Sequence, residues 1–199
     1  MRIGIIGAGA IGQAFARQAL RAGYQVILSN SRGPQSLASL VEDLGPGASA
    51  GTVREAALAD MVMIAVPWKY LPQALADVPP WEGRIVVDMT NPLVPPDFRA
   101  ANLHGRTSSE VVADLVPGAR LVKAFNTLPP ELLSTVPYEA GGRHVIFLSG
   151  NDAAARAEVS RLIQSLGFAS IDLGDLPTGG RLQGIPGGPL PALNLIKLA

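Results

Sequence analysis

The segment IGIIGAGAIG, residues 3–12, decides the fold of this chain. Its first four residues, 3–6, form an apolar run typical of a strand buried on both faces. The pattern GxGxxG follows at once over residues 7–12, and apolar side chains then recur at every fourth position from 11 to 19. A strand, a glycine-rich turn and an amphipathic helix in direct succession indicate the first unit of a doubly wound α/β sheet.

The same glycines predict a binding function. Gly7 permits the tight turn, Gly9 lets the backbone approach a pyrophosphate, and Gly12 lets the helix pack close to the strand. The start of the helix offers free N–H groups and a partial positive charge to a diphosphate. A chance glycine turn is the alternative, and the strand, helix and second strand in register argue against it. We therefore expect a dinucleotide to bind at Gly7, Ala8, Gly9, Ala10, Ile11 and Gly12.

The rest of the chain continues the alternation of strands and helices. Further strands are predicted over residues 24–28, 61–66, 84–88, 121–124, 145–148 and 169–173, with helices over 34–45 and from Asp152 to Gly167. Residues 177–191 are rich in Gly and Pro and read as a loop, and 193–198 as the start of a helix. We predict an α/β, Rossmann-type doubly wound, mainly parallel sheet, with a dinucleotide-binding domain over 1–137. Residues 138–199 form a small C-terminal α/β extension on the same sheet, for substrate or dimer contacts.

Composition excludes several function classes. The 199 residues hold 16 Lys and Arg against 16 Asp and Glu, so no basic surface for nucleic acid is indicated. The absence of cysteine excludes disulfides and thiolate chemistry, and the distant His104 and His144 predict no metal site. No apolar run approaches the roughly 20 residues of a membrane span. We expect a cytoplasmic protein with a small-molecule substrate.

The end of the second predicted strand indicates which dinucleotide is preferred. Folds that bind NAD place a carboxylate there, about 20 residues beyond the glycine motif. This chain instead has Ser29, Asn30, Ser31 and Arg32, and its next carboxylate is Glu42. Hydroxyl groups and a guanidinium can bind the 2′-phosphate of NADP, which a carboxylate would repel. We therefore predict NADP(H), held at Ser31 and Arg32; the alternative leaves Arg32 as a solvated turn residue.

Three further strand ends are expected to meet the remainder of the cofactor. In open α/β sheets ligands lie beyond the carboxyl ends of the strands. Those ends carry Val66, Pro67 and Trp68, then Thr90 and Asn91, then Asn126 and Thr127. Their alternative reading is as strand terminators and an ordinary half-buried tryptophan.

Few residues suggest catalysis. Lys123, Asn126 and Thr127 are weak candidates, since a lysine at a strand end could polarise a carbonyl but could equally form a structural ion pair or contact a phosphate. Glu110 fits the first turn of a helix, where a carboxylate is stabilising. Asp88 is expected to cap the loop that follows its strand.

Several segments together resemble a known family. They are residues 3–12, SNSRGP at 29–34, AVP at 65–67, DMTN at 88–91, SSE at 108–110, VKAFNT at 122–127 and GGPL at 187–190. The set is similar to the NADPH-dependent reductases of the deazaflavin coenzyme F420 and to related ferric-reductase dinucleotide domains. The resemblance covers nearly the whole chain, although residues 35–39 lack a basic residue that relatives often have, and relatives tend to continue beyond residue 199.

The resemblance implies hydride transfer between NADP and a deazaflavin or flavin ring, in a homodimer. That ring would lie over residues 67–70, Asn91 and 126–127, with 184–190 completing the cleft. The apolar stretch 189–198 also favours a dimer. Two alternatives stay open: a reductase of a small carbonyl or imine, with Lys123 or Tyr70 as proton donor, and a module that senses the dinucleotide without turnover.

Overall fold

A computed structural model describes residues 1–94 and 96–198 of the chain. One large sheet contains β1 (Arg2–Ile6), β2 (Gln25–Ser29), β3 (Ala48–Ala50), β4 (Met61–Ile64), β5 (Ile85–Asp88), β8 (Arg120–Ala124), β9 (Tyr138–Glu139), β10 (Gly142–Gly150), β11 (Ala169–Asp172) and β12 (Ile196–Leu198). A separate hairpin pairs β6 (Leu93–Val94) with β7 (Arg99–Ala100).

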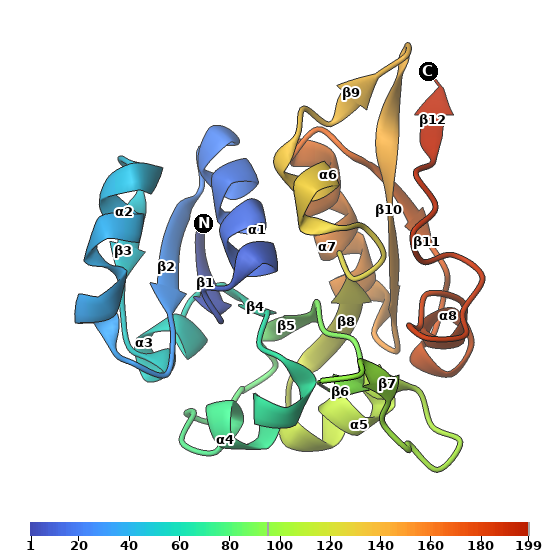
Figure 1. The fold of residues 1–199 in the computed structure, drawn as a ribbon, viewed down its shortest axis with the longest axis horizontal. Coiled ribbons are helices and arrows are strands. Elements are labelled where there is room, and N and C mark those ends of the chain that lie inside the picture. The colour runs from blue at the N-terminus through green and yellow to red at the C-terminus, as the bar shows by residue number, and fades with distance from the viewer. Residues whose placement is uncertain (95, 199) are drawn as a thin grey trace.

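The helices connect these strands (Figure 1). They are α1 (Ala10–Arg21), the 3₁₀ turn η1 (Pro34–Leu37), α2 (Ala38–Leu44), α3 (Val53–Ala57), the 3₁₀ turn η2 (Trp68–Tyr70), α4 (Leu71–Leu75), α5 (Ser108–Leu115), α6 (Pro130–Ser134), α7 (Ala153–Ser165) and α8 (Leu176–Leu182).

The strand order confirms the predicted Rossmann-type α/β fold. The sheet runs β11-β10-β8-β5-β4-β1-β2-β3, and the six strands from β3 to β8 are parallel. Chain order reverses beside β1, since β2 lies on one side of it and β4 on the other. This reversal is the point at which open α/β sheets bind their ligands. Beyond β8, β10 is antiparallel and carries β11 at its side.

Burial on both faces explains why the strands read as continuous apolar runs. Ile5 belongs to the core cluster shared with Phe15 of α1, whereas its neighbour Ile6 belongs to the cluster that includes Val112 of α5. Both isoleucines are essentially inaccessible to solvent. Because alternate side chains of a strand point to opposite faces, a strand between two helical layers buries both sets and is apolar at most positions.

The C-terminal extension differs from expectation in two places. Residues 177–191 were expected to form a loop, but the first part of this region lies in α8. Asp175 caps that helix by accepting a hydrogen bond of 2.8 Å from the N–H of Thr178. Pro177 lies in the first turn, where its missing N–H leaves no hydrogen bond unmade. The Gly and Pro content predicted a loop, but the cap from Asp175 and the position of Pro177 in the first turn allow a helix here.

The helix expected from residue 193 is also wrong. Residues Ile196–Leu198 form the strand β12, antiparallel to the start of β10, with Arg143 opposite Lys197. Helical periodicity in so short a segment is a weak local preference, and pairing with β10 overrides it. Leu195 and Leu198 are exposed at 40% and 69%, so the expected contact with a second copy stays a prediction.

The second predicted helix differs from expectation only at its start. The helix predicted from Pro34 begins as the 3₁₀ turn η1 before α2, and Gly45 ends it as expected.

Of the helices in the part of the chain that the structure describes, none has the length and apolar character of a membrane span. The boundary predicted near residue 137 falls within a continuous sheet, since β8 pairs with β10.

Candidate functional site

The glycine motif forms a tight cradle between β1 and α1. Gly7 has a φ of 113°, and a Cβ added there would overlap the carbonyl of Ala65. A Cβ on Gly12 would overlap the carbonyl of Gly7, so the fold itself requires both glycines. Gly9 is different, because a Cβ there would have no atom within 4 Å. Its lack of a side chain leaves open the space in front of the first turn of α1.

The turn after β2 divides its polar residues into two groups. Ser29 is buried, and its hydroxyl donates to the carbonyl of Ile5 at 3.0 Å. Asn30 shapes the turn, since its Oδ1 accepts from the N–H of Arg32 at 2.9 Å and its Nδ2 donates to Ser36. The side chains of Ser31 and Arg32 are exposed. These two are therefore the residues of the turn with groups available to a ligand.

The strand ends expected to meet the cofactor are adjacent in space. Pairing places Ile64 beside Asp88, and Asp88 beside Lys123. The loops after β5 and β8 are joined further by their asparagines. Asn91 Nδ2 donates to the carbonyl of Asn126 at 3.0 Å, and Asn126 Nδ2 donates to Asn91 Oδ1 at 3.0 Å. The structure thus assembles one polar edge from segments about 35 residues apart.

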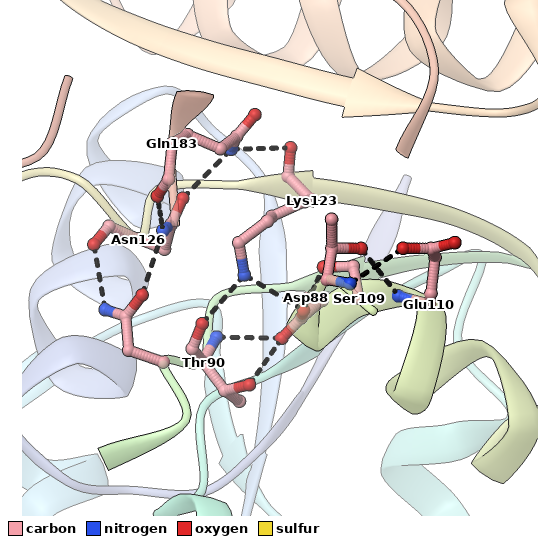
Figure 2. A network of polar contacts seen from close by, with 9 residues as sticks. Asp88, Thr90, Ser109, Glu110, Lys123, Asn126 and Gln183 are labelled. Atoms are coloured by element: carbon pink, nitrogen blue, oxygen red, sulfur yellow. Dashed lines mark hydrogen bonds and ion pairs between the residues drawn. The ribbon is translucent and has the colours of Figure 1, made fainter. Parts of the chain in front are cut away.

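A buried ion pair lies behind this edge (Figure 2). Lys123 Nζ is 3.2 Å from Asp88 Oδ2, and both side chains are fully enclosed. Lys123 also donates to the carbonyl of Thr90 at 2.9 Å, while Thr90 donates to Asp88 Oδ1 through its N–H and its hydroxyl. Ser109 donates its hydroxyl to Asp88 as well. The lysine is therefore in a structural ion pair, one of its three expected roles, and Asp88 caps its loop as expected.

Glu110 holds the beginning of α5, the helix that carries Ser109. Its carboxylate accepts from the N–H of Thr107 at 2.7 Å, and Thr107 Oγ1 accepts from the N–H of Glu110 at 3.2 Å. This is a complete capping box, which confirms the structural reading of Glu110. The hydrogen bond from the Thr107 backbone lowers the pKa of Glu110 below its ordinary value.

This lowered pKa predicts an acid-dependent contribution to stability. A carboxyl whose pKa is lower in the folded state stabilises the fold when ionised, and the contribution is lost as pH falls from the unfolded pKa through the folded one. We expect Glu110→Gln to be less stable than wild type at neutral pH, with the difference shrinking below about pH 4. Denaturant unfolding of both proteins between pH 7 and pH 3 checks this. A difference that stays constant across that range would contradict it.

The structure adds the backbone conformation of Phe125, a residue of one expected strand end, and the residue Gln183, which was not anticipated from the sequence. Phe125 has a left-handed φ of 62°, and its ring packs edge-on against Phe15 of α1 with centroids 5.2 Å apart. Gln183, the residue after α8, donates its Nε2 to Asn126 Oδ1 at 2.9 Å and to the carbonyl of Lys123 at 3.3 Å. The resemblance pointed to the adjoining segment 184–190, but no local pattern marks a glutamine whose partners lie about 57 residues away.

Three buried polar side-chain atoms within residues 1–94 and 96–198 make no hydrogen bond: Thr127 Oγ1, Ser149 Oγ and Gln183 Oε1. Native structures leave few such atoms unsatisfied. Two of the three, on Thr127 and Gln183, belong to the segments that meet at the end of β8. In the same described portion, no group of three His, Asp or Glu side chains is placed to bind a metal ion.

Comparison with known proteins agrees with this geometry. Residues 2–92 match the family described as NADP oxidoreductase, coenzyme F420-dependent. A crystal structure of a hypothetical protein from Sinorhizobium meliloti is 46% identical with a TM-score of 0.93, over 99% of this chain and 96% of that one. A second, from Arthrobacter sp. FB24, was proposed to be an F420-dependent NADP reductase. It is 31% identical with a TM-score of 0.77, over 88% and 86% of the two chains.

A curated relative is longer than this chain. The metalloreductase STEAP3 of Rattus norvegicus is 26% identical over 193 residues, which cover 96% of this chain and 37% of the rat protein. The chain thus spans little more than a third of the curated relatives it matches.

Proposed function

Since the chain belongs to the family of coenzyme F420-dependent NADP oxidoreductases, we propose that it transfers hydride between NADP(H) and a deazaflavin or flavin-type ring. The observation that carries the proposal is the state of Lys123. Its ammonium group is enclosed and bonded to Asp88 and to the Thr90 carbonyl, so it is not available to protonate a substrate. Hydride exchange between two rings needs no such donor, whereas carbonyl reduction does.

The residues available to hold NADP are arranged along the edge of the sheet. The free N–H groups at the start of α1 suit the diphosphate, with Gly9 leaving it room. Ser31 and Arg32 suit the 2′-phosphate. The joined loops of Asn91 and Asn126 lie where the nicotinamide half would follow. When bound, NADPH supplies the hydride, and these residues hold the cofactor in place.

We infer that the acceptor is a flat ring, because the residues of the site provide binding and orientation in preference to acid–base chemistry. Two rings held face to face react without proton transfer from a side chain. Tyr70, the other proton donor considered, is 47% exposed, and the ammonium of Lys69 lies 4.7 Å from its ring centroid. A phenol in water on the surface is poorly placed to protonate an enclosed carbonyl.

Anaerobic mixing of NADPH with the oxidised deazaflavin tests the proposal. Loss of the visible absorbance of the deazaflavin at an enzymatic rate is the expected result. NADPH binding with no loss of absorbance for deazaflavin, FMN or FAD would contradict it. Turnover of a small carbonyl or imine in that case would favour the alternative reductase, and binding without any turnover would favour a sensing module.

Replacing Arg32 tests the preference for NADP. Arg32→Ala is expected to weaken NADPH binding by roughly tenfold to a hundredfold, the usual range for a lost charge-assisted hydrogen bond to phosphate, and to leave NADH binding unchanged. Fluorescence titration with both cofactors measures the two affinities. Arg161→Ala, an exposed arginine on α7, is the matched control. An NADPH affinity that Arg32→Ala leaves unchanged would show that Arg32 is only a solvated turn residue, and equal losses for NADPH and NADH would place Arg32 away from the 2′-phosphate.

A further inference from the structure

The carboxamide of Gln183 joins two segments that are far apart in the chain, the end of α8 and the end of β8. It lies at the beginning of the segment 183–192, here called the arm, which runs from α8 past the end of β8 toward β12 (Figures 1 and 2). Its Nε2 donates to Asn126 Oδ1 at 2.9 Å and to the carbonyl of Lys123 at 3.3 Å. The backbone carbonyl of Gln183 accepts from Asn126 Nδ2 at 2.6 Å.

These contacts use both side-chain donors of Asn126. Its Oδ1 accepts from Gln183, and its Nδ2 donates both to Gln183 and to Asn91. Since an amide has two N–H groups, Asn126 has no donor left for another partner. Asn126 is therefore fixed by protein atoms on every side, and through Asn91 the loop after β5 is fixed with it.

The orientation of the Gln183 amide is equally determined. Its two partners, Asn126 Oδ1 and the Lys123 carbonyl, are both acceptors, so the nitrogen must face them. The oxygen is then left buried without a partner. A buried oxygen without a hydrogen bond destabilises the fold. It persists where the surrounding structure requires the arrangement, and such sites are often functional.

The arm also contacts the next residue of the same loop. The carbonyl of Thr127 accepts from the N–H of Ala192 at 2.9 Å, while its buried hydroxyl makes no hydrogen bond within the described residues. Phe125, two residues before Thr127, has a left-handed backbone. Both ends of the arm, Gln183 and Ala192, therefore hold the loop 125–127. A loop with a left-handed residue and a hydroxyl without a hydrogen bond is typical of a prearranged binding surface.

We propose that Gln183 is a positioning residue for the nicotinamide half of bound NADP, acting through Asn126 on the loop 125–128. The inference rests on the proposed function, because it assumes that NADP binds along this edge. In this proposal the arm supports only the nicotinamide half of the site. The adenosine half of NADP binds at the glycine cradle and Arg32, which Gln183 does not touch. Loss of Gln183 should therefore weaken one half of the cofactor site and spare the other.

Two ligands separate those halves: NADP⁺, and adenosine 2′,5′-bisphosphate, which has the adenosine and 2′-phosphate but no nicotinamide. The variant Gln183→Met keeps a similar volume and removes both donated hydrogen bonds. We expect its affinity for NADP⁺ to fall about tenfold while its affinity for adenosine 2′,5′-bisphosphate stays within about twofold of wild type. Isothermal titration calorimetry measures both affinities on the full chain.

A second variant gives a signature that a loss of packing cannot produce. In Gln183→Glu the side chain can donate to Asn126 Oδ1 only when it is protonated, and burial favours the protonated form. We expect the ratio of the two affinities to approach that of wild type at pH 5 and to worsen toward pH 8. The 5′-phosphate of adenosine 2′,5′-bisphosphate titrates in this range and the diphosphate of NADP⁺ does not, so the ratio is compared with the wild-type ratio at the same pH, which removes every ionisation of the ligands.

The control is Gln164→Met, which removes an exposed amide on α7. Its affinities should match wild type. If Gln183→Met unfolds, the pH dependence of Gln183→Glu still decides. Wild-type binding of both ligands, together with a ratio in the Gln183 variants that equals the wild-type ratio at every pH, would overturn this inference alone. Failure of the wild-type chain to bind either ligand would overturn the proposed function as well.

Discussion

Replacing Gly9 by alanine is expected to leave the fold intact and to weaken NADP(H) binding by roughly a hundredfold, about the loss of two charge-assisted hydrogen bonds. The backbone at Gly9 has a φ of −79°, which alanine adopts readily. A methyl group there would meet no protein atom within 4 Å. It would instead occupy the space through which a diphosphate reaches the first N–H groups of α1.

The neighbouring glycine provides the contrast. Gly12→Ala places a methyl group against the carbonyl of Gly7, so we expect this variant to lose stability, with any loss of binding following from it. Thermal unfolding and fluorescence titration with NADPH separate the two effects. If Gly9→Ala binds NADPH as wild type does, the diphosphate does not lie on this cradle.

Removing Lys123 should have the largest effect on stability. Lys123→Met leaves the carboxylate of Asp88 enclosed without its cation, and breaking a buried pair in this way costs about 3–5 kcal/mol. Denaturant unfolding of the wild type and the variant measures the loss. Asp88 keeps hydrogen bonds from Thr90 and Ser109, which place the loss toward the lower end of that range.

The double variant identifies the cause. Asp88→Asn combined with Lys123→Met removes both charges and keeps the shape of the pair. Its cost should be smaller than that of Lys123→Met alone, because no unpaired charge remains. A double variant at least as unstable as the sum of the two single variants would show that the lysine acts by packing and not by its charge.

Local sequence patterns predicted the part of the fold in which short-range order decides the structure. The run of residues 3–6, the glycine motif and the helical spacing from 11 to 19 each depend on neighbours within a few residues, and β1 and α1 follow from them. The same was true of the helix capped by Asp152. Short elements such as β3 and α3 have too few residues to show a period, and they were not anticipated.

The remainder depended on contacts between distant segments. The strand β12 exists because it pairs with β10, and nothing within residues 193–198 requires it. The role of Lys123 could not be chosen from the sequence, since all three readings need only a lysine at a strand end; its enclosure beside Asp88 decides among them. The contacts of Gln183 could be recognised only from the structure, in which α8 places this residue over the end of β8.

The most direct test of hydride transfer uses NADPH labelled with deuterium at C4 of the nicotinamide, in its two epimeric forms, mixed anaerobically with oxidised deazaflavin. Mass spectrometry of the reduced ring then follows the label. We predict that deuterium passes to the ring from one epimer and not from the other, because a site that holds two rings face to face exposes a single side of the nicotinamide. Reduced ring without deuterium from either epimer, or no reduction at all, would contradict direct hydride transfer by this protein.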